Sequence, residues 1–140
     1  MFSTALDGSD VRLIASAGVA PLLFSHNGKY AVVSREGKLQ IWEAEQNAWI
    51  AVPSLERSDF VIGLTDDGQS LYVARVGDTG PEIVRIRVRN GVVDHLADVP
   101  LVDRSGMLAI VRLAITPDEK TIIVNYVRHT AELYLMQPYQ

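Results

Sequence analysis

One polar turn occurs three times in this chain. Each copy leads from an apolar residue into an apolar, β-branched run, and the copies are Phe24-Ser-His-Asn-Gly28, Leu64-Thr-Asp-Asp-Gly68 and Ile115-Thr-Pro-Asp-Glu119. Gly68 follows Gly28 by 40 residues, and Glu119 follows Gly68 by 51. A period of this length is typical of four-stranded β units, with one longer loop in the last interval. The repeat therefore predicts a fold built from similar units.

The segments between these turns read as strands. Apolar and polar residues alternate there, and Gly, Asn, Asp and Pro interrupt every periodic segment before it reaches helical length. We predict strands near 20–24, 29–34, 38–43 and 48–52 in the first unit, near 60–65, 70–76, 82–88 and 92–97 in the second, and near 110–116, 121–127 and 131–136 in the third. The expected fold is all-β, a partial β-propeller of about three four-stranded antiparallel blades.

The expected domain organisation is a single partial propeller over residues 1–140. Residues 1–16 are the end of a preceding blade, 17–55 and 56–98 are blades, and 99–140 is an incomplete blade. A propeller ring usually has about 4–8 blades, so three would leave apolar faces open to neighbours. The missing blades can belong to the same polypeptide, or two copies can pair head to tail as a homodimer. In a third arrangement, Val11–Ile14 supplies the last outer strand, but the ring would be too tight.

Composition excludes several classes of function. The formal net charge is -4, whereas a nucleic-acid-binding surface usually shows a basic stripe, so no nucleic acid partner is expected. The chain has no cysteine, which excludes disulfides, thiolate metal sites and cysteine nucleophiles. The N-terminal segment lacks signal-peptide features, and no apolar run approaches the length of a membrane span. As a stand-alone chain, the protein is expected to be cytoplasmic, without membrane insertion.

Asp66 and Asp67 are the first candidates for acid/base chemistry. Adjacent turn residues point in different directions, however, and acidic residues at these positions usually cap the hairpin. His26 lies in a turn and His129 in a late hairpin, where a solvated histidine is the ordinary case. We therefore expect no catalytic residues here, and no enzyme activity from this chain.

A second cluster joins one histidine to acidic residues. His95 is close in sequence to Asp94, Asp98 and Asp103, and these groups can hold a divalent metal if a loop folds the carboxylates around the imidazole. Period-2 alternation puts Asp94 and His95 on opposite faces of their strand. Since no pair has a recognised ligand interval, we expect neither a metal site nor a cofactor.

Two long loops, Gly77–Pro81 and Val99–Met107, carry the binding hypothesis, because long loops on a propeller rim usually hold the specificity. Trp42 and Trp49 flank a hairpin and are expected to pack between blades rather than to bind a ligand. The candidate binding residues in or beside the loops are Arg75, Asp78, Arg104 and Arg128, although solvated surface charge explains each of them equally well.

Several stretches carry a family resemblance. They are Leu64–Val73, Ile83–Val88, Leu101–Gly106 and Leu113–Lys120, together with Tyr126 and Glu132–Leu135. This pattern resembles the C-terminal end of TolB-like, WD-repeat-like β-propellers, as found in bacterial receptor-type serine/threonine kinases. The resemblance implies an upstream kinase domain, often a transmembrane helix, and a propeller that senses signals or binds proteins. It also implies an extracytoplasmic location if the chain is the tail of such a kinase.

The chain departs from the family pattern at two turns. Glu119 stands where the family usually has glycine, and His26-Asn27 replaces the more usual Pro-Asp. The chain also has no Gly-rich phosphate loop and no His-Arg-Asp catalytic segment, so kinase activity cannot belong to these residues.

Three hypotheses about function follow. The first is a noncatalytic propeller segment that binds a protein or peptide partner, or acts as a sensor, within a larger bacterial signalling protein. The second is the propeller portion of a serine peptidase or lyase whose catalytic residues lie outside this chain. The third is a self-assembling homodimeric scaffold.

Overall fold

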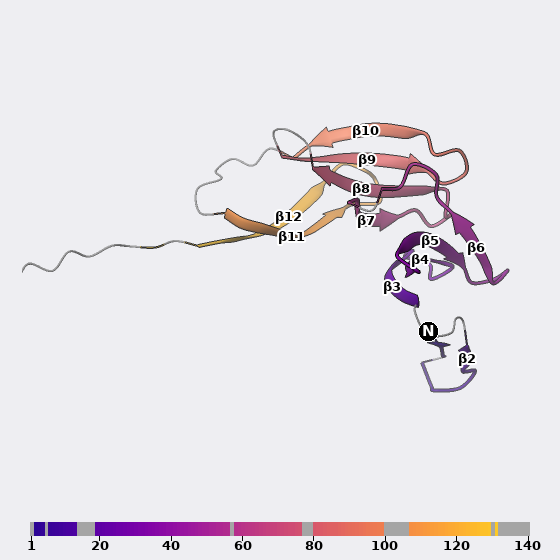
Figure 1. The fold of residues 1–140 in the computed structure, drawn as a ribbon. Helices are drawn as coiled ribbons and strands as arrows, with labels where there is room; N and C mark the ends of the chain where they lie inside the picture. The colour runs from indigo at the N-terminus through magenta and orange to yellow at the C-terminus, as the bar shows by residue number, and fades with distance from the viewer. Residues whose placement is uncertain are drawn as a thin grey trace, which may run out of the picture.

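The computed structural model describes residues 2–4, 6–13, 19–56, 58–76, 80–99, 107–129 and 131, and all regular secondary structure in these ranges is β-strand (Figure 1). The strands are β1 (Phe2–Ser3), β2 (Arg12–Leu13), β3 (Val19–Phe24), β4 (Tyr30–Arg35), β5 (Lys38–Glu43), β6 (Ala48–Ala51), β7 (Phe60–Leu64), β8 (Ser70–Val76), β9 (Pro81–Arg87), β10 (Val93–Asp98), β11 (Met107–Ile115) and β12 (Ile122–Arg128). The prediction of an all-β fold is confirmed for the described residues.

The predicted strand boundaries of the first two units lie within one residue of the observed ones. In the third unit β11 begins at Met107, earlier than the predicted 110, and the strand predicted near 131–136 falls almost entirely outside the described residues. The turn residues predict the strand boundaries well because the hairpins contain strong local signals, such as the left-handed glycines Gly28 and Gly68.

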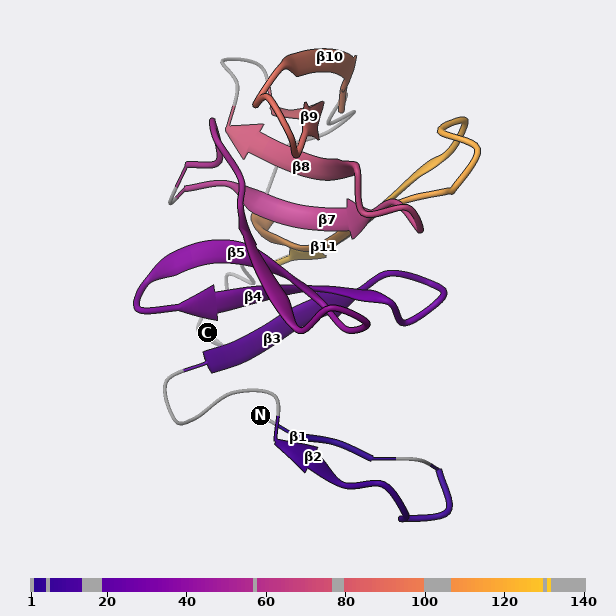
Figure 2. The same cartoon turned by 90° about the vertical axis from the view of Figure 1, so that its right-hand side faces the viewer.

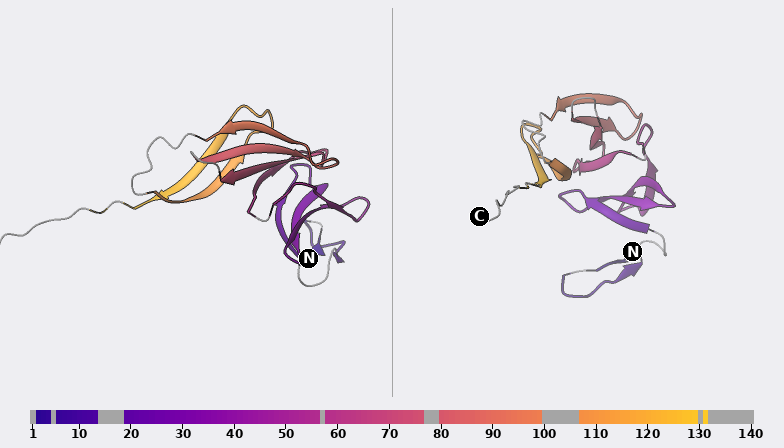
Figure 3. Two further views of the ribbon diagram at one scale, coloured as in Figure 1. Left: turned by 45° about the horizontal axis from the view of Figure 1, so that its top comes forward. Right: turned by 60° about the vertical axis from the view of Figure 1, so that its left-hand side comes forward.

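The strands form antiparallel sheets in simple meander order. Two sheets have four strands each, β3-β4-β5-β6 and β7-β8-β9-β10, while β11-β12 and β1-β2 are two-stranded. The first strand of the middle sheet, β7, contacts both β3 and β11, which are the first strands of the neighbouring sheets. Figure 2 shows β11 next to β7. The described sheets follow one another along an open curve (Figure 3).

The three repeated turns contain the same hydrogen bonds. In the second turn, the Ser70 N–H donates to the Thr65 hydroxyl at 3.0 Å, and the Asp67 carboxylate accepts from the Gln69 N–H at 2.9 Å. The corresponding bonds are Tyr30 N–H to Ser25 Oγ and Lys29 N–H to Asn27 Oδ1 in the first turn, and Thr121 N–H to Thr116 Oγ1 and Lys120 N–H to Asp118 Oδ1 in the third. The sequence repeat is therefore also a structural repeat.

Side-chain alternation along the strands builds two cores between sheets. The larger core lies between the two four-stranded sheets and contains Val32, Ile41, Leu71, Val73, Val84 and Ile86. The smaller core lies between the middle sheet and the β11-β12 hairpin and contains Ala74, Ile83, Val99 and Leu113. In both cores the apolar face of one sheet is covered by the next sheet, because an isolated antiparallel pair buries too little apolar surface to be stable.

Trp42 is a core residue, as predicted, but it does not lie between the two four-stranded sheets. It is buried with Ala31 and Val33 on the face of its sheet that is turned away from the middle sheet. Its indole N–H donates to Asn47 Oδ1 at 3.0 Å. The neighbouring Trp49 is only partly buried, and its ring lies 5.2 Å from the Arg35 guanidinium. The tryptophans therefore cover the outer face of their own sheet.

The β11-β12 hairpin is more exposed than its counterparts. β12 is a second strand, like β4 and β8, and the turn alignment makes Ile123 equivalent to Val32 and Tyr72. Val32 is 0% exposed and Tyr72 5%, whereas Ile123 is 60% exposed. β4 and β8 are paired on both edges, whereas within the described ranges β12 pairs only with β11. One face of β12 thus presents apolar side chains to the surroundings.

Candidate functional site

The carboxylate pair of the second repeated turn has a structural role. The Asn27 N–H donates to Asp66 Oδ1 at 3.1 Å, and the Asn27 side-chain amide donates to the Asp66 carbonyl at 2.7 Å. Asp67 instead caps its own turn, and the hydrogen bond from the Thr65 hydroxyl lowers the pKa of Asp67. The two side chains point to different partners, as predicted. Asp66 joins the first turn to the second, and Asp67 stabilises the second.

Glu119 connects the third turn to the middle sheet. It adopts a left-handed φ of 59°, close to the 71° of Gly28 and the 68° of Gly68. The Tyr72 hydroxyl donates to its carboxylate at 2.7 Å, and Arg85 Nη1 donates at 3.0 and 3.2 Å. Burial, followed by the hydrogen bond to Glu119, raises the pKa of Tyr72 to about 12. A non-glycine residue in this conformation costs about 1–2 kcal/mol, and these contacts offset that cost.

Arg75, one of the four predicted binding residues, is partly buried and forms an ion pair with a buried carboxylate. Its Nε and Nη2 donate to the two oxygens of Asp59 at 2.9 and 3.0 Å, and Nη2 also donates to the Ser54 carbonyl at 2.8 Å. The Asp59 side chain is only 1% exposed, and its hydrogen bond raises the pKa of Arg75. These donors hold the connection between β6 and β7 against β8.

The other three predicted binding residues are not brought together by any described contact. Asp78 and Arg104 lie outside the described residues. Arg128 is exposed at the end of β12, with its guanidinium 5.2 Å from the centroid of the Tyr126 ring. The loops predicted to bind a partner, 77–81 and 99–107, are also largely outside the described ranges.

A groove of about 820 Å³ lies between the two four-stranded sheets, at the end opposite the repeated turns. We call it the inter-sheet groove. Leu22 of β3 and Phe60 of β7 both line it and are 54% and 52% exposed. Its other apolar lining residues include Leu39, Val52, Leu55 and Val61, and its polar lining includes Ser34, Lys38, Glu56 and Asp59. An apolar groove with few polar groups is the usual form of a binding site.

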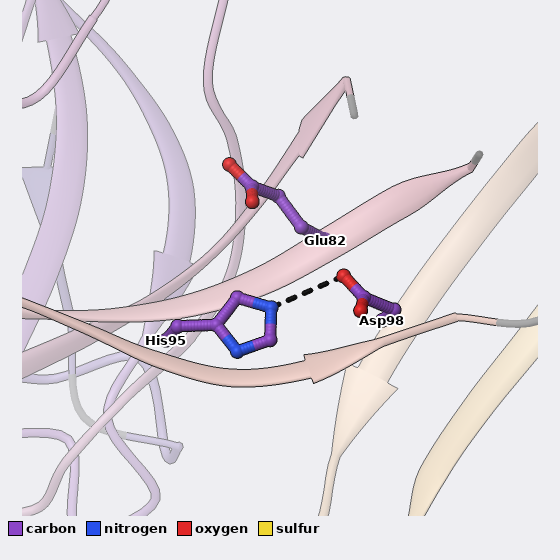
Figure 4. Close-up of side chains that lie close together, drawn as sticks. All are labelled: Glu82, His95 and Asp98. Atoms are coloured by element: carbon purple, nitrogen blue, oxygen red, sulfur yellow. Dashed lines mark hydrogen bonds and ion pairs between the residues drawn. The ribbon is translucent and has the colours of Figure 1, made fainter. Parts of the chain in front are cut away.

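The histidine cluster is divided between two faces of the middle sheet. Asp94 pairs with Arg85 at 3.4 Å and with Arg87 at 3.1 Å. His95 Nε2 lies 3.1 Å from Asp98 Oδ1 on the other face (Figure 4). The opposite orientation of Asp94 and His95 is therefore confirmed, while Asp103 lies outside the described residues.

Glu82 lies close to His95 and Asp98, and the sequence did not predict this proximity. One ligand atom from each of Glu82, His95 and Asp98 lies within 4.8 Å of the others. Glu82 is directly opposite Asp98 in the β9-β10 pairing. Strand pairing alone brings them together, so no sequence spacing signals the contact. Leu22 and Phe60 were likewise missed, because an apolar residue in a predicted strand is ordinarily assigned to the core.

His26 and His129 are both exposed, as expected for solvated histidines.

No helix in the described ranges is long and apolar enough to cross a membrane.

Comparison with known proteins gives no relative. No family model, no curated protein and no solved structure matches the chain.

Proposed function

We propose that this chain is a noncatalytic interaction module that binds an extended, mainly apolar peptide segment of a protein partner in the inter-sheet groove. The observation that carries the proposal is the exposure of Leu22 and Phe60, each more than half exposed, in the lining of a groove between two sheets. Large apolar side chains gathered around a concave surface are typical of interaction sites.

The position of the groove favours an extended partner. β3 and β7 are both terminal strands of their sheets. A peptide can add to such an edge through main-chain hydrogen bonds, while alternate side chains enter an adjacent groove. Register shifts at Pro21/Leu23 and Val61/Gly63 interrupt both edge strands. Such bulges hinder unspecific strand addition, which favours recognition by the groove over indiscriminate edge pairing.

The charges around the groove favour a segment with little net charge. Lys38 and Glu56 lie in the lining with opposite signs, and Asp59 is neutralised by Arg75. A strongly acidic peptide would be attracted by Lys38 but repelled by Glu56, and a strongly basic peptide would meet the reverse. The chemistry therefore fits apolar side chains flanked by polar, uncharged ones.

A random 12-residue peptide library displayed on phage tests this function directly. The full chain is used for selection, and enriched peptides are then measured by fluorescence polarisation against the chain and two variants. Phe60→Asp places a charge in the groove, and Val92→Asp is the matched control, because Val92 is also exposed but lies between β9 and β10. Since a central aromatic contact is commonly worth more than about 2 kcal/mol, Phe60→Asp should weaken binding by at least about tenfold.

The control variant should bind like the unmodified chain. Enriched peptides that bind Phe60→Asp with undiminished affinity would overturn the groove as the site. Failure to enrich any peptide would overturn the proposed function itself.

The proposed function includes a wider architecture, in which the sheets are blades of a larger β-propeller within a bacterial signalling protein. The identical bonding of the three turns, the meander order and the adjacency of β3, β7 and β11 support it. In this arrangement, further blades of the same polypeptide cover the exposed face of β12.

Light scattering coupled to size exclusion tests whether the exposed face of β12 associates with another molecule. Concentration-dependent association that is suppressed by Ile123→Asp supports an exposed blade face. A stable dimer of twice the 15.4 kDa chain mass would instead assign the covering to a second copy. A monodisperse monomer at all concentrations, unchanged by Ile123→Asp, would overturn the blade interpretation.

A further inference from the structure

A β-bulge brings His95 and Asp98 onto one face of the middle sheet. In a regular strand, residues three apart point to opposite faces. Here His95 pairs with Val84, Ala97 pairs with Ile83, and the register shifts between them. Because the bulge contains one extra residue, the side chains of His95 and Asp98 point to the same face of the sheet. The imidazole and the Asp98 carboxylate therefore meet at 3.1 Å.

Strand pairing adds a second carboxylate to this face. Glu82 of β9 lies directly opposite Asp98 of β10, and one ligand atom from each of the three side chains lies within 4.8 Å of the others (Figure 4). Like charges directly opposite each other on neighbouring strands are destabilising. The arrangement therefore favours a positively charged group between the two carboxylates.

The arginine on this face, Arg75, is hydrogen-bonded mainly to a different carboxylate. Arg75 is the cross-strand partner of Glu82 in β8. Its Nε and Nη2, however, are bonded to both oxygens of Asp59, which is almost completely buried. Asp59 therefore interacts with Arg75 more strongly than Glu82 does, and Arg75 balances only part of the negative charge of Glu82 and Asp98.

We propose that Glu82, His95 and Asp98 form a binding site for a divalent transition-metal ion, with Zn²⁺ as the best match. One imidazole nitrogen and two carboxylate oxygens are ligands that Zn²⁺ accepts, at metal–ligand distances of about 2.0–2.2 Å. Neighbouring ligands of a tetrahedral ion with such bonds are separated by roughly 3.3 Å. His95 Nε2 and Asp98 Oδ1 are hydrogen-bonded at 3.1 Å, which is close to this value.

Side-chain freedom allows the third ligand to close the site. His95 and Asp98 have side chains that are 51% and 71% exposed, and Glu82 is partly buried. Rotation of these side chains needs no change in the backbone pairing that sets their positions. Three protein ligands leave the fourth position of the ion open to water or to a donor atom from a partner. The bound ion would join β9 to β10 and reinforce the outer edge of the sheet.

Titration of the full chain, without an affinity tag, with ZnCl₂ in an isothermal calorimeter tests the site. We expect one Zn²⁺ per chain. Contacts that merely support a metal ligand are worth about 10–100-fold in affinity, so loss of a ligand in His95→Ala should weaken binding by at least about tenfold. His26→Ala is the matched control, because His26 is an exposed histidine of a turn and should leave Zn²⁺ affinity unchanged.

A second measurement separates loss of the site from loss of the fold. Zn²⁺ should raise the Tm of the unmodified chain and of His26→Ala, but not the Tm of His95→Ala or Asp98→Asn. Circular dichroism of each variant without metal should match that of the unmodified chain. Equal Zn²⁺ affinity in His95→Ala and the unmodified chain, or no heat of binding at 1 mM ZnCl₂, would overturn the proposal.

Discussion

Tyr72 and Glu119 lie 47 residues apart in the sequence and are joined by a hydrogen bond of 2.7 Å from the phenolic hydroxyl to the carboxylate. Tyr72 belongs to β8 of the middle sheet, and Glu119 to the turn of the β11-β12 hairpin. The same carboxylate accepts from Arg85. Glu119 stands where the two other turns have glycine. Its left-handed backbone is less favourable than that of glycine, but its side chain forms a contact between sheets that glycine cannot form.

Replacing Glu119 separates these two effects. Glu119→Ala loses both contacts and keeps the left-handed strain, so we expect a loss of about 1–3 kcal/mol in the free energy of unfolding. Glu119→Gly loses the same contacts but relieves the strain, and should be more stable than the alanine variant by about 1 kcal/mol. Urea denaturation measures both. Equal stability of the two variants would show that the turn is unstrained.

The raised pKa of Tyr72 predicts a loss of stability at alkaline pH. Because the folded state favours the neutral phenol, its contribution is fully present below the ordinary tyrosine pKa of 10.0 and is lost as the pH rises toward about 12. Tyr72→Phe, which has no ionisable group, should show a flatter fall in stability over this range. Urea midpoints at several values of pH provide the comparison. A parallel fall in both proteins would assign the alkaline loss to other groups.

Breaking the Arg75–Asp59 pair should be costly. Asp59 is almost completely buried, and removing one partner of a buried pair leaves an uncompensated charge that costs about 3–5 kcal/mol. Arg75→Ala is therefore expected to lower the free energy of unfolding by this amount. Arg87→Ala is the control, because Arg87 pairs with Asp94 at the surface and such pairs contribute about 0–1 kcal/mol. A similar small loss in both variants would contradict the structural role assigned to Arg75.

Gly28 and Gly68 form a natural matched pair. Both adopt a left-handed φ, so alanine at either position carries the same conformational cost of about 1–2 kcal/mol. A Cβ atom at Gly68 would lie 2.7 Å from Tyr30 Cε1, whereas at Gly28 no atom lies within 4 Å. Gly68→Ala should therefore lower the thermal midpoint more than Gly28→Ala. Equal midpoints would mean that the Tyr30 ring moves aside without cost.

The strands and turns could be predicted from the sequence because their signals are local. The residues of each repeated turn supply the hydroxyl, the carboxylate or amide and the left-handed position that the turn needs, all within six residues, as in Thr65–Ser70. Hydrophobic alternation then defines each strand. Even the unusual glutamate of the third turn was identified from its position in the repeat, although its partners were not.

The candidate sites could not be predicted in the same way, because their residues meet through pairing and packing between distant segments. The register of β9 and β10 places Glu82 opposite Asp98, and a bulge orients His95 to the same face. No residue type in the sequence predicts this bulge. Leu22 and Phe60 line one groove because β3 and β7 belong to sheets that pack together. Arg75 was predicted at a binding rim, but the structure engages it with Asp59.

The all-β class, the repeat and the strand boundaries of the first two units follow from the sequence alone, since these depend on the conformational preferences of neighbouring residues. The pairing of charges, the exposure of apolar side chains and the common face of Glu82, His95 and Asp98 follow only from the tertiary structure. Those outcomes depend on register and on packing between sheets, where a shift of one residue turns every side chain to the opposite face.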